Sequence, residues 1–320
     1  ARYFFVVCAL LHNEADIVVE FAKHHLDQGV DHLYFIDDES TDHFEQRLAA
    51  CGIAAASYSV FRRGFGPGKP YADQKAVLNS MIALLRREAK WAAFVDTDEF
   101  LVPRANPTRK VAAILSTLPM AACHAIAVPW LIFSRGNMTS ESVGNVRFMY
   151  RWRWGLDRRF ALGREPAVKK FGNRISRKNG NRMYMEVKTI FRTAVVNRSH
   201  VHGVEFIDDF TGRVCTPSGA SAESASPYRV WDLRESAVDQ LPLAVHHYRF
   251  RSLGVFSKKA GEKFSADWGQ VRPLPGAESD RNLGADDEVR QLDAITNRMD
   301  VYDDFAVNRL GIRLKGSTCR

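Results

Sequence analysis

The segment Trp91–Phe100, WAAFVDTDEF, carries the strongest local signal in the chain. Trp91–Val95 is a short apolar run of strand length, and the acidic residues Asp96, Asp98 and Glu99 come directly after it. Because one residue separates the first two carboxylates, both can reach one hard divalent cation from a common side. An apolar run resumes at Phe100 and leaves little room for a solvated turn. The segment therefore predicts a buried strand that ends at a metal site.

The residues before this segment alternate between strand-like and helix-like patterns. Strand-like runs are expected at Tyr3–Leu11, His32–Asp37 and Ile53–Phe61, and helical spacing of apolar residues separates them. A further helix is expected over residues 72–89. This alternation predicts an α/β fold with a mostly parallel sheet and helices on both faces.

The helix starts have their own sequence signals. Asn13 is a candidate cap for the first helix, and Ser40 or Thr41 for the second, because short polar side chains accept hydrogen bonds from the first free N–H groups of a helix.

Polar residues follow each predicted strand of the first hundred residues. In such sheets ligands bind at the carboxyl ends of the strands, and a carboxylate after the second strand contacts a nucleoside. We therefore expect one crevice to be lined by Asn13, Glu14, Asp37, Asp38, Arg62, Arg63 and the acidic cluster.

Beyond residue 103 the pattern becomes less regular. We expect helices at Pro107–Leu118 and 253–264, strands at Ala125–Phe133 and Leu243–Phe250, a loop at 216–229 and a terminal helical region at Asp286–Leu310.

Charge is concentrated in one part of the chain. The 320 residues include 45 Lys plus Arg and 37 Asp plus Glu, a net charge of +8. Between Arg147 and Arg192 there are 14 basic and 3 acidic residues, which leaves 31 − 34 = −3 for the remainder. Aromatic residues interleave with this basic segment, which is compatible with nucleic acid, with an anionic donor or acceptor, or with an anionic membrane surface. No nucleic-acid-binding motif accompanies it, so we expect a peripheral membrane or glycan role and no nucleic-acid partner.

The five cysteines are far apart and form no Cys-x-x-Cys pair, a spacing typical of reduced thiols in a cytoplasmic protein. No apolar run is long enough to span a membrane. A cytoplasmic, membrane-associated protein is expected; a Golgi-lumen protein is the alternative if an upstream anchor has been removed.

Six blocks, in order, resemble glycosyltransferases of the GT-A fold, and specifically glycosyltransferase family 92 and its bacterial relatives in the family 2 superfamily. The blocks are Leu11–Glu14 with Gly29–His32, Ile36–Asp38 with Ser40–Asp42, Gln74–Asn79, Trp91–Pro103, Val187–Arg192, and His247-Tyr248 with Ser252 and Lys258. The resemblance implies a GT-A (Rossmann-like) α/β fold. It divides the chain into a nucleotide-sugar-binding half (1–135), an acceptor-side half (136–265) and a C-terminal helical extension (266–320).

The resemblance also implies roles for individual residues. Asp98 would ligate the metal, Asp96 would reach the metal or the ribose, and His247 would supply a third ligand; an imidazole ligand favours Mn²⁺ over Mg²⁺. The implied donor-binding residues are Leu11, Asn13, Glu14, Asp37, Lys75, Asp96, Lys188 and Lys258. Members of the family usually have a Trp followed closely by Phe-Gly. This chain has the different sequence Trp130–Gly136 at that place, so the resemblance does not identify the acceptor.

The resulting hypothesis is a metal-dependent, inverting glycosyltransferase that uses a nucleoside diphosphate sugar, UDP-linked by preference, and a glycan acceptor of anionic character. Inversion needs a base for the acceptor hydroxyl, and Glu205, Asp208 and Asp209 are the candidates. The alternatives are a nucleotidyltransferase, whose glycine-rich loop would follow the first strand, and a nucleic-acid-binding module that uses the basic segment.

Overall fold

The computed structural model describes residues 1–63, 74–136, 146–153, 173–175, 183–200, 202–208, 210–222, 230–231, 233–248, 251 and 301–309. The helix expected at 253–264 and most of the basic segment lie outside these residues.

The first part of the chain forms a parallel sheet. β1 (Tyr3–Leu11), β2 (His32–Asp37), β3 (Tyr58–Arg62) and β4 (Ala89–Phe94) lie in the order β3-β2-β1-β4. Between them in sequence come α1 (Val18–Asp27), α2 (Phe44–Ala50) and α3 (Gln74–Glu88). The predicted alternation of strands and helices is therefore confirmed.

The later strands extend this sheet and turn it toward the acidic cluster. β10 (Val187–Arg192) is antiparallel to both β4 and β6 (Ala125–Ser134). The first half of β6 pairs with β10 and its second half with β15 (Ala244–His247), which is itself antiparallel to β5 (Glu99–Val102). Strands from both predicted halves of the chain thus share one sheet, and the turn between β4 and β5 lies where the two pairings meet.

The remaining described elements are short. They are the 3-10 helices η1 (Ala55–Ser57), η4 (Thr193–Val195) and η5 (Glu235–Gln240), the helices α4 (Val111–Leu115), α5 (Leu118–Ala121), α6 (Val146–Met149) and α9 (Phe305–Asn308), and the strands β7 (Trp152–Arg153), β8 (Asn173–Ile175), β9 (Met183–Met185), β11 (Val196–His200), β12 (Gly203–Phe206), β13 (Val214–Cys215), β14 (Val230–Trp231) and β16 (Val301–Tyr302).

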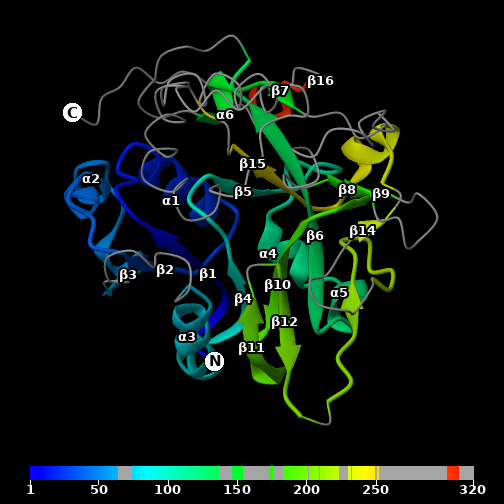
Figure 1. Ribbon diagram of the computed structural model, residues 1–320, viewed down its shortest axis with the longest axis horizontal. Coiled ribbons are helices and arrows are strands. Elements are labelled where there is room, and N and C mark those ends of the chain that lie inside the picture. Colours follow the sequence, from blue (N-terminus) through cyan, green and yellow to red (C-terminus); the bar gives the residue numbers. More distant parts are fainter. Residues whose placement is uncertain are drawn as a thin grey trace, which may run out of the picture.

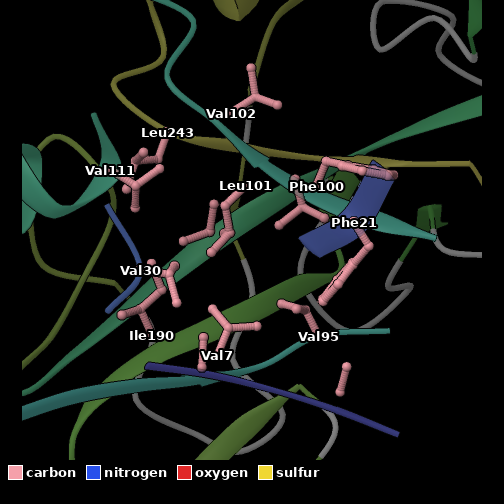
Figure 2. Close-up of a cluster of buried hydrophobic side chains, with 14 of the residues drawn as sticks. Val7, Phe21, Val30, Val95, Phe100, Leu101, Val102, Val111, Ile190 and Leu243 are labelled. Atoms are coloured by element: carbon pink, nitrogen blue, oxygen red, sulfur yellow. The ribbon is translucent and has the colours of Figure 1, made fainter. Parts of the chain in front are cut away.

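The side chains of β1 show why the sheet needs helices on both faces. Alternate strand residues point to opposite faces, and all positions from Phe5 to Ala9 are buried. Val7 packs in a cluster with α1 and β5, where it meets Phe21 and Phe100 (Figure 2). Its neighbour Cys8 packs on the other face with α3. Figure 1 accordingly shows α3 apart from α1 and α2, beside β11.

Neither predicted helix cap is used as expected. α1 begins at Val18 after Ile17, and α2 begins at Phe44 after His43. Asn13 and Ser40 instead bond to each other's segments: the backbone N–H of Asn13 donates to the hydroxyl of Ser40. The polar side chains that seemed suited to capping join the ends of β1 and β2.

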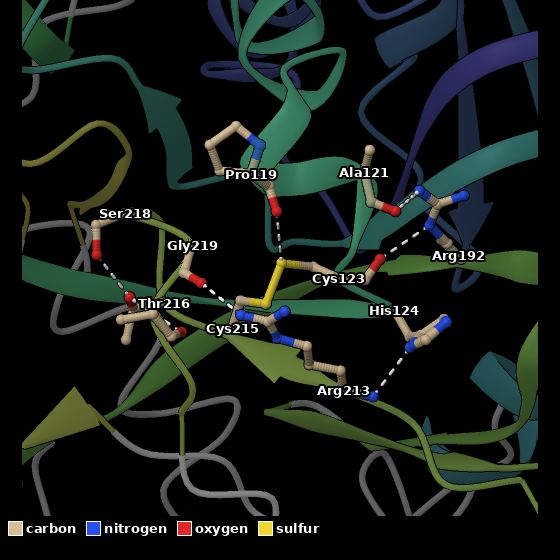
Figure 3. Close-up of a disulfide and its surroundings, with 11 residues drawn as sticks. Pro119, Ala121, Cys123, His124, Arg192, Arg213, Cys215, Thr216, Ser218 and Gly219 are labelled. Atoms are coloured by element: carbon tan, nitrogen blue, oxygen red, sulfur yellow. Dashed lines mark hydrogen bonds between the residues drawn. A yellow bond between two sulfur atoms is a disulfide. The ribbon is translucent and has the colours of Figure 1, made fainter.

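The expectation of reduced thiols is wrong. Cys123 and Cys215, which are 92 positions apart in sequence, form a disulfide, and Cys51 is also disulfide-bonded; Cys8 is free and buried. The bond joins the residues before β6 to β13, and Figure 3 shows it among hydrogen bonds from Arg192 and Arg213 to nearby carbonyl groups. Because the two cysteines are so far apart in sequence, their spacing contained no signal of this pairing.

Part of the expected terminal helix is also different. Val301 and Tyr302 form β16, which pairs with β7, and only Phe305–Asn308 is helical in the described part of this region. Asp303 follows β16 and accepts hydrogen bonds from Arg104 at 3.0 Å and Arg153 at 2.6 Å. A buried carboxylate with two guanidinium partners fixes this segment against the core. Among the described helices, none has the length and apolar character needed to cross a membrane.

Candidate active site

The turn between β4 and β5 is closed by its own polar groups. The backbone N–H of Asp96 donates to the Glu99 carboxylate at 2.8 Å, and the N–H of Glu99 donates to the carbonyl of Asp96 at 2.9 Å. Glu99 is completely buried, and its burial raises its pKa to about 7, against the opposing effect of Lys188. Glu99 therefore holds the shape of the turn rather than facing a ligand.

Lys188 lies beneath this turn. Its Nζ is 3.0 Å from an oxygen of Asp96 and 3.0 Å from one of Glu99. Burial alone would lower the pKa of Lys188, but the two carboxylates outweigh that effect and raise it, so the side chain stays charged. Lys188 reaches this place because β10 lies directly beside β4. The predicted donor-binding lysine is thus a buried partner of the acidic turn.

Asp98 and His247 face each other from two different elements. Asp98 Oδ1 lies 3.5 Å from His247 Nε2, and both residues are buried. Pairing of β15 with β5 brings His247 opposite Glu99, and the next residue, Tyr248, donates its backbone N–H to the carbonyl of Asp98 at 2.8 Å. The structure therefore brings together two of the three predicted metal ligands and pairs Asp96 with Lys188.

Asp98 and His247 suit a metal ion that takes its other ligands from a bound phosphate substrate and from water. Within the described residues no group of three or more His, Cys, Asp or Glu side chains surrounds a point that could hold a metal. Mg²⁺ and related ions commonly take one or two protein ligands and complete their coordination with phosphate oxygens and water. Asp98 and His247 match that pattern, and neutral imidazole suits Mn²⁺.

The charge around Asp98 also favours a cation. Glu14 and Asp16 flank the buried guanidinium of Arg251 at 3.1 and 2.6 Å, much as Asp96 and Glu99 flank Lys188. The charge of Asp98 is close enough to raise the pKa of Arg251, although burial opposes this and Asp16 and Glu14 contribute more. With all five carboxylates ionised, the cluster carries −5 + 2 = −3 charges. A divalent cation would offset most of this excess.

The ends of β1 and β2 form the neighbouring wall. Asn13 has a left-handed backbone, with φ of 52°, and its side-chain oxygen accepts the N–H of Thr41 at 2.8 Å. The N–H of Ala15 donates to Asp42 at 2.6 Å. Asp37 is buried and accepts the N–H of Ser40 at 2.9 Å. The expected convergence of the first two strand ends is therefore present.

Replacement of Asn13 with alanine is expected to lower the free energy of unfolding by about 1–2 kcal/mol, because alanine disfavours a left-handed backbone and cannot accept the N–H of Thr41. Urea denaturation measures the change. Asn13→Gly is the matched control, since glycine tolerates this backbone and loses only the hydrogen bond. Equal losses in the two variants would show that the backbone conformation is not a source of the effect.

The other predicted site residues are buried, exposed or outside the described part of the chain. Leu11 is buried at the end of β1, and Lys75 is exposed in the first turn of α3. Lys258 and Asp209 lie outside the described residues. Of the candidate bases, Glu205 is within 2.6 Å of His200 Nε2 and Asp208 is exposed beyond the end of β12.

Several residues of the site had no assigned role in the sequence. Arg251 is four residues after His247, and only its charge opposite an acidic cluster could have indicated it. Trp130 contacts the ring of His247, with centroids 4.6 Å apart, and also that of His202, at 4.9 Å. These contacts depend on how β6, β10 and β15 pair, which no local pattern shows.

The basic segment contributes internal ion pairs where it is described. Arg147 pairs with Glu20 at 2.8 Å, Arg153 with Asp303, and Lys188 with the acidic turn. Three of its cations therefore stabilise the core rather than form a basic surface.

The sequence identity and structural similarity of this chain to known proteins are low. The chain matches no protein-family model and no curated protein. Among solved structures it is similar to the mannosyltransferase PcManGT from Pyrobaculum calidifontis in complex with GDP-Man and Mn²⁺, with 17% identity, a TM-score of 0.29, and coverage of 40% of this chain and 36% of that chain. It is similar to glucosyl-3-phosphoglycerate synthase from Mycobacterium tuberculosis in complex with Mn²⁺, UDP and glucosyl-3-phosphoglycerate, with 16% identity, a TM-score of 0.29, and coverage of 60% and 57%. It is also similar to HddC from Yersinia pseudotuberculosis, with 11% identity, a TM-score of 0.35, and coverage of 67% and 89%.

The chain spans 42% of a mycobacterial protein and 36% of the mannosyltransferase, less than half of each. The sheet, parallel over β3-β2-β1-β4 and then antiparallel at β10, confirms the predicted α/β fold with a mostly parallel sheet in its first part.

Proposed function

We propose that this protein is a metal-dependent, inverting glycosyltransferase of the kind found in family 92 and its family 2-like relatives. It would move a sugar from a nucleoside diphosphate sugar, UDP-linked by preference, to a hydroxyl group of a glycan. The observation that carries the proposal is the facing pair of Asp98 and His247 at the carboxyl end of β4, within a cluster of excess negative charge.

Manganese is the ion that these ligands favour, and Mg²⁺ is the alternative. When bound, the ion would stabilise the negative charge that develops on the leaving diphosphate. Asp98 and His247 would hold it, while Lys188 keeps Asp96 and Glu99 in place from below. Asp96 is the more exposed of these two carboxylates, and it would contact the ribose.

The donor nucleotide would lie across the ends of β1, β2 and β4. A small cavity, with room for about one water molecule, lies at the carboxyl ends of β1 and β4 and is lined by Leu10, Leu78, Asp96 and Lys188, among others. Asn13, Glu14 and Asp37 form the adjoining wall. This is the edge at which doubly wound sheets bind nucleotides. Residues 1–135 would therefore supply the donor site and 136–265 the acceptor side, with 266–320 as an extension.

The disulfides favour an oxidising compartment. Disulfides persist in secretory and extracellular environments and are rare in the cytosol. We therefore place the protein in the lumen of a secretory compartment such as the Golgi, the alternative that the sequence left open, rather than in the cytoplasm. An anionic glycan acceptor and association with a membrane surface remain part of the proposal, through basic residues of 147–192 other than those in internal ion pairs.

A nucleotide-sugar panel with and without Mn²⁺ tests the donor assignment. We expect UDP-sugars to raise the melting temperature only when Mn²⁺ is present, because a ligand that binds the native state alone stabilises it by mass action. A ligand at about 100 times its Kd would add about 2.7 kcal/mol. Differential scanning fluorimetry measures the shift, with Ca²⁺ as the matched control ion.

Two results would contradict the proposal. One is equal stabilisation by UDP-sugars with and without the metal. The other is release of pyrophosphate from UTP and a sugar 1-phosphate, which would identify a nucleotidyltransferase.

A further inference from the structure

His202 lies immediately before β12 and packs against the candidate active site. Its ring contacts Trp130, with centroids 4.9 Å apart, and Trp130 in turn contacts His247. One side chain therefore links His202 to a candidate metal ligand. Lys188 also lies near the indole, with its Nζ 5.8 Å from the ring centroid.

Two hydrogen bonds to β10 hold His202 in place. Its Nδ1 is 2.9 Å from the carbonyl oxygen of Val187, and its own carbonyl accepts the hydroxyl of Thr189 at 3.1 Å. A carbonyl oxygen can only accept, so Nδ1 carries the proton in the neutral ring and Nε2 presents a lone pair. Within the described part of the chain the hydrogen bond of the ring is the one at Nδ1. Burial and the charge of Lys188 lower the pKa of His202, with Glu186 and Asp96 acting in the opposite sense, so the ring is neutral near pH 7.

Of the acids that the sequence offered for this task, the two in the described part of the chain, Glu205 and Asp208, are less well placed. Glu205 is engaged by His200. Asp208 comes two residues after the end of β12, whereas His202 precedes the start of that strand, so Asp208 lies toward its other end. His202 is the group of this region that contacts the candidate site through Trp130.

We propose that His202 is the general base of the transfer reaction. This inference rests on the proposed function. As the acceptor oxygen bonds to the anomeric carbon of the donor sugar, its hydroxyl proton passes to Nε2. The bond from that carbon to the diphosphate oxygen breaks, and its electron pair leaves with the diphosphate. The resulting imidazolium returns its proton to water.

The test uses hydrolysis of the donor, in which water replaces the unidentified acceptor. UDP release is measured from UDP-glucose, UDP-galactose and UDP-N-acetylglucosamine with saturating Mn²⁺. His202→Gln and His202→Ala are expected to lower kcat by about 100-fold or more, the usual contribution of a general base. Their affinity for UDP with Mn²⁺ is expected to stay within about threefold of the natural chain. Added imidazole should restore turnover in His202→Ala, where the side chain leaves space, and not in His202→Gln.

Matched variants separate this role from a structural one. His200→Gln, in the same part of the chain, should keep its kcat. A loss in Glu205→Gln as large as that in His202→Gln would make Glu205 the base and overturn the inference. So would unchanged turnover in His202→Ala, or a loss that imidazole does not restore. Failure of the natural chain to bind UDP with Mn²⁺, or to release UDP, would instead contradict the proposed function.

Discussion

Replacement of Asp98 with asparagine is expected to lower Mn²⁺-dependent UDP release by about 100-fold or more, because a divalent ion supplies several kcal/mol of charge stabilisation to the leaving diphosphate. Asparagine keeps the shape of the side chain and removes its charge. The Asp98 carboxylate faces His247 at 3.5 Å, and no other carboxylate of the cluster lies as close to that imidazole. The Mn²⁺-induced rise in melting temperature should disappear together with turnover.

The fold of this variant should survive. The backbone carbonyl of Asp98, which accepts the N–H of Tyr248, is unchanged, and one negative charge is removed from a cluster with more acidic than basic groups. Without metal its free energy of unfolding should therefore fall by no more than about 1 kcal/mol. Asp27→Asn, an exposed carboxylate on α1, is the control for loss of charge alone. Full activity in the Asp98 variant, or in excess chelator, would contradict the metal assignment.

The first half of the fold was predictable because its signals are local. β1 and β2 have the predicted bounds Tyr3–Leu11 and His32–Asp37, since continuous apolar runs of strand length fit buried parallel strands. Helix starts were less predictable. Ser40 and Thr41 have the chemistry of helix caps, but their groups bond to Asn13 from the neighbouring strand end. A partner 27 or 28 residues away cannot be inferred from a cap pattern.

The candidate site also combines residues with a local sequence signal and residues whose positions depend on distant parts of the chain. Asp96, Asp98 and the strand before them are contiguous, so their proximity was evident from sequence. His247 was expected only through a family resemblance, and its approach to Asp98 depends on β15 pairing with β5 across 142 or more residues of chain. The buried position of Lys188 was harder to predict than the position of His247. Lys188 has the charge to bind a diphosphate, yet its burial beside two carboxylates makes it an internal ion-pair partner.

Removal of the Cys123–Cys215 disulfide is expected to lower the free energy of unfolding by about 4 kcal/mol and the melting temperature by about 10 °C. The bond closes a long loop, because the two cysteines are 92 positions apart in sequence, so breaking it releases much conformational freedom in the unfolded chain. Thermal and urea denaturation of the Cys123→Ala/Cys215→Ala variant measure the loss.

The single variants show whether the cross-link is the cause. Cys123→Ala and Cys215→Ala each break the same bond, so each should lose about as much stability as the double variant. Losses that add would instead indicate packing, because both sulfur atoms are buried. Alkylation of both thiols in the native protein before reduction would contradict the bond itself.

Protein made in an oxidising compartment should be the more stable form. Protein made in the cytosol should lack this bond and lose the same stability as the double variant does. That comparison tests the contribution of the bond independently of any activity, because it needs neither donor nor acceptor.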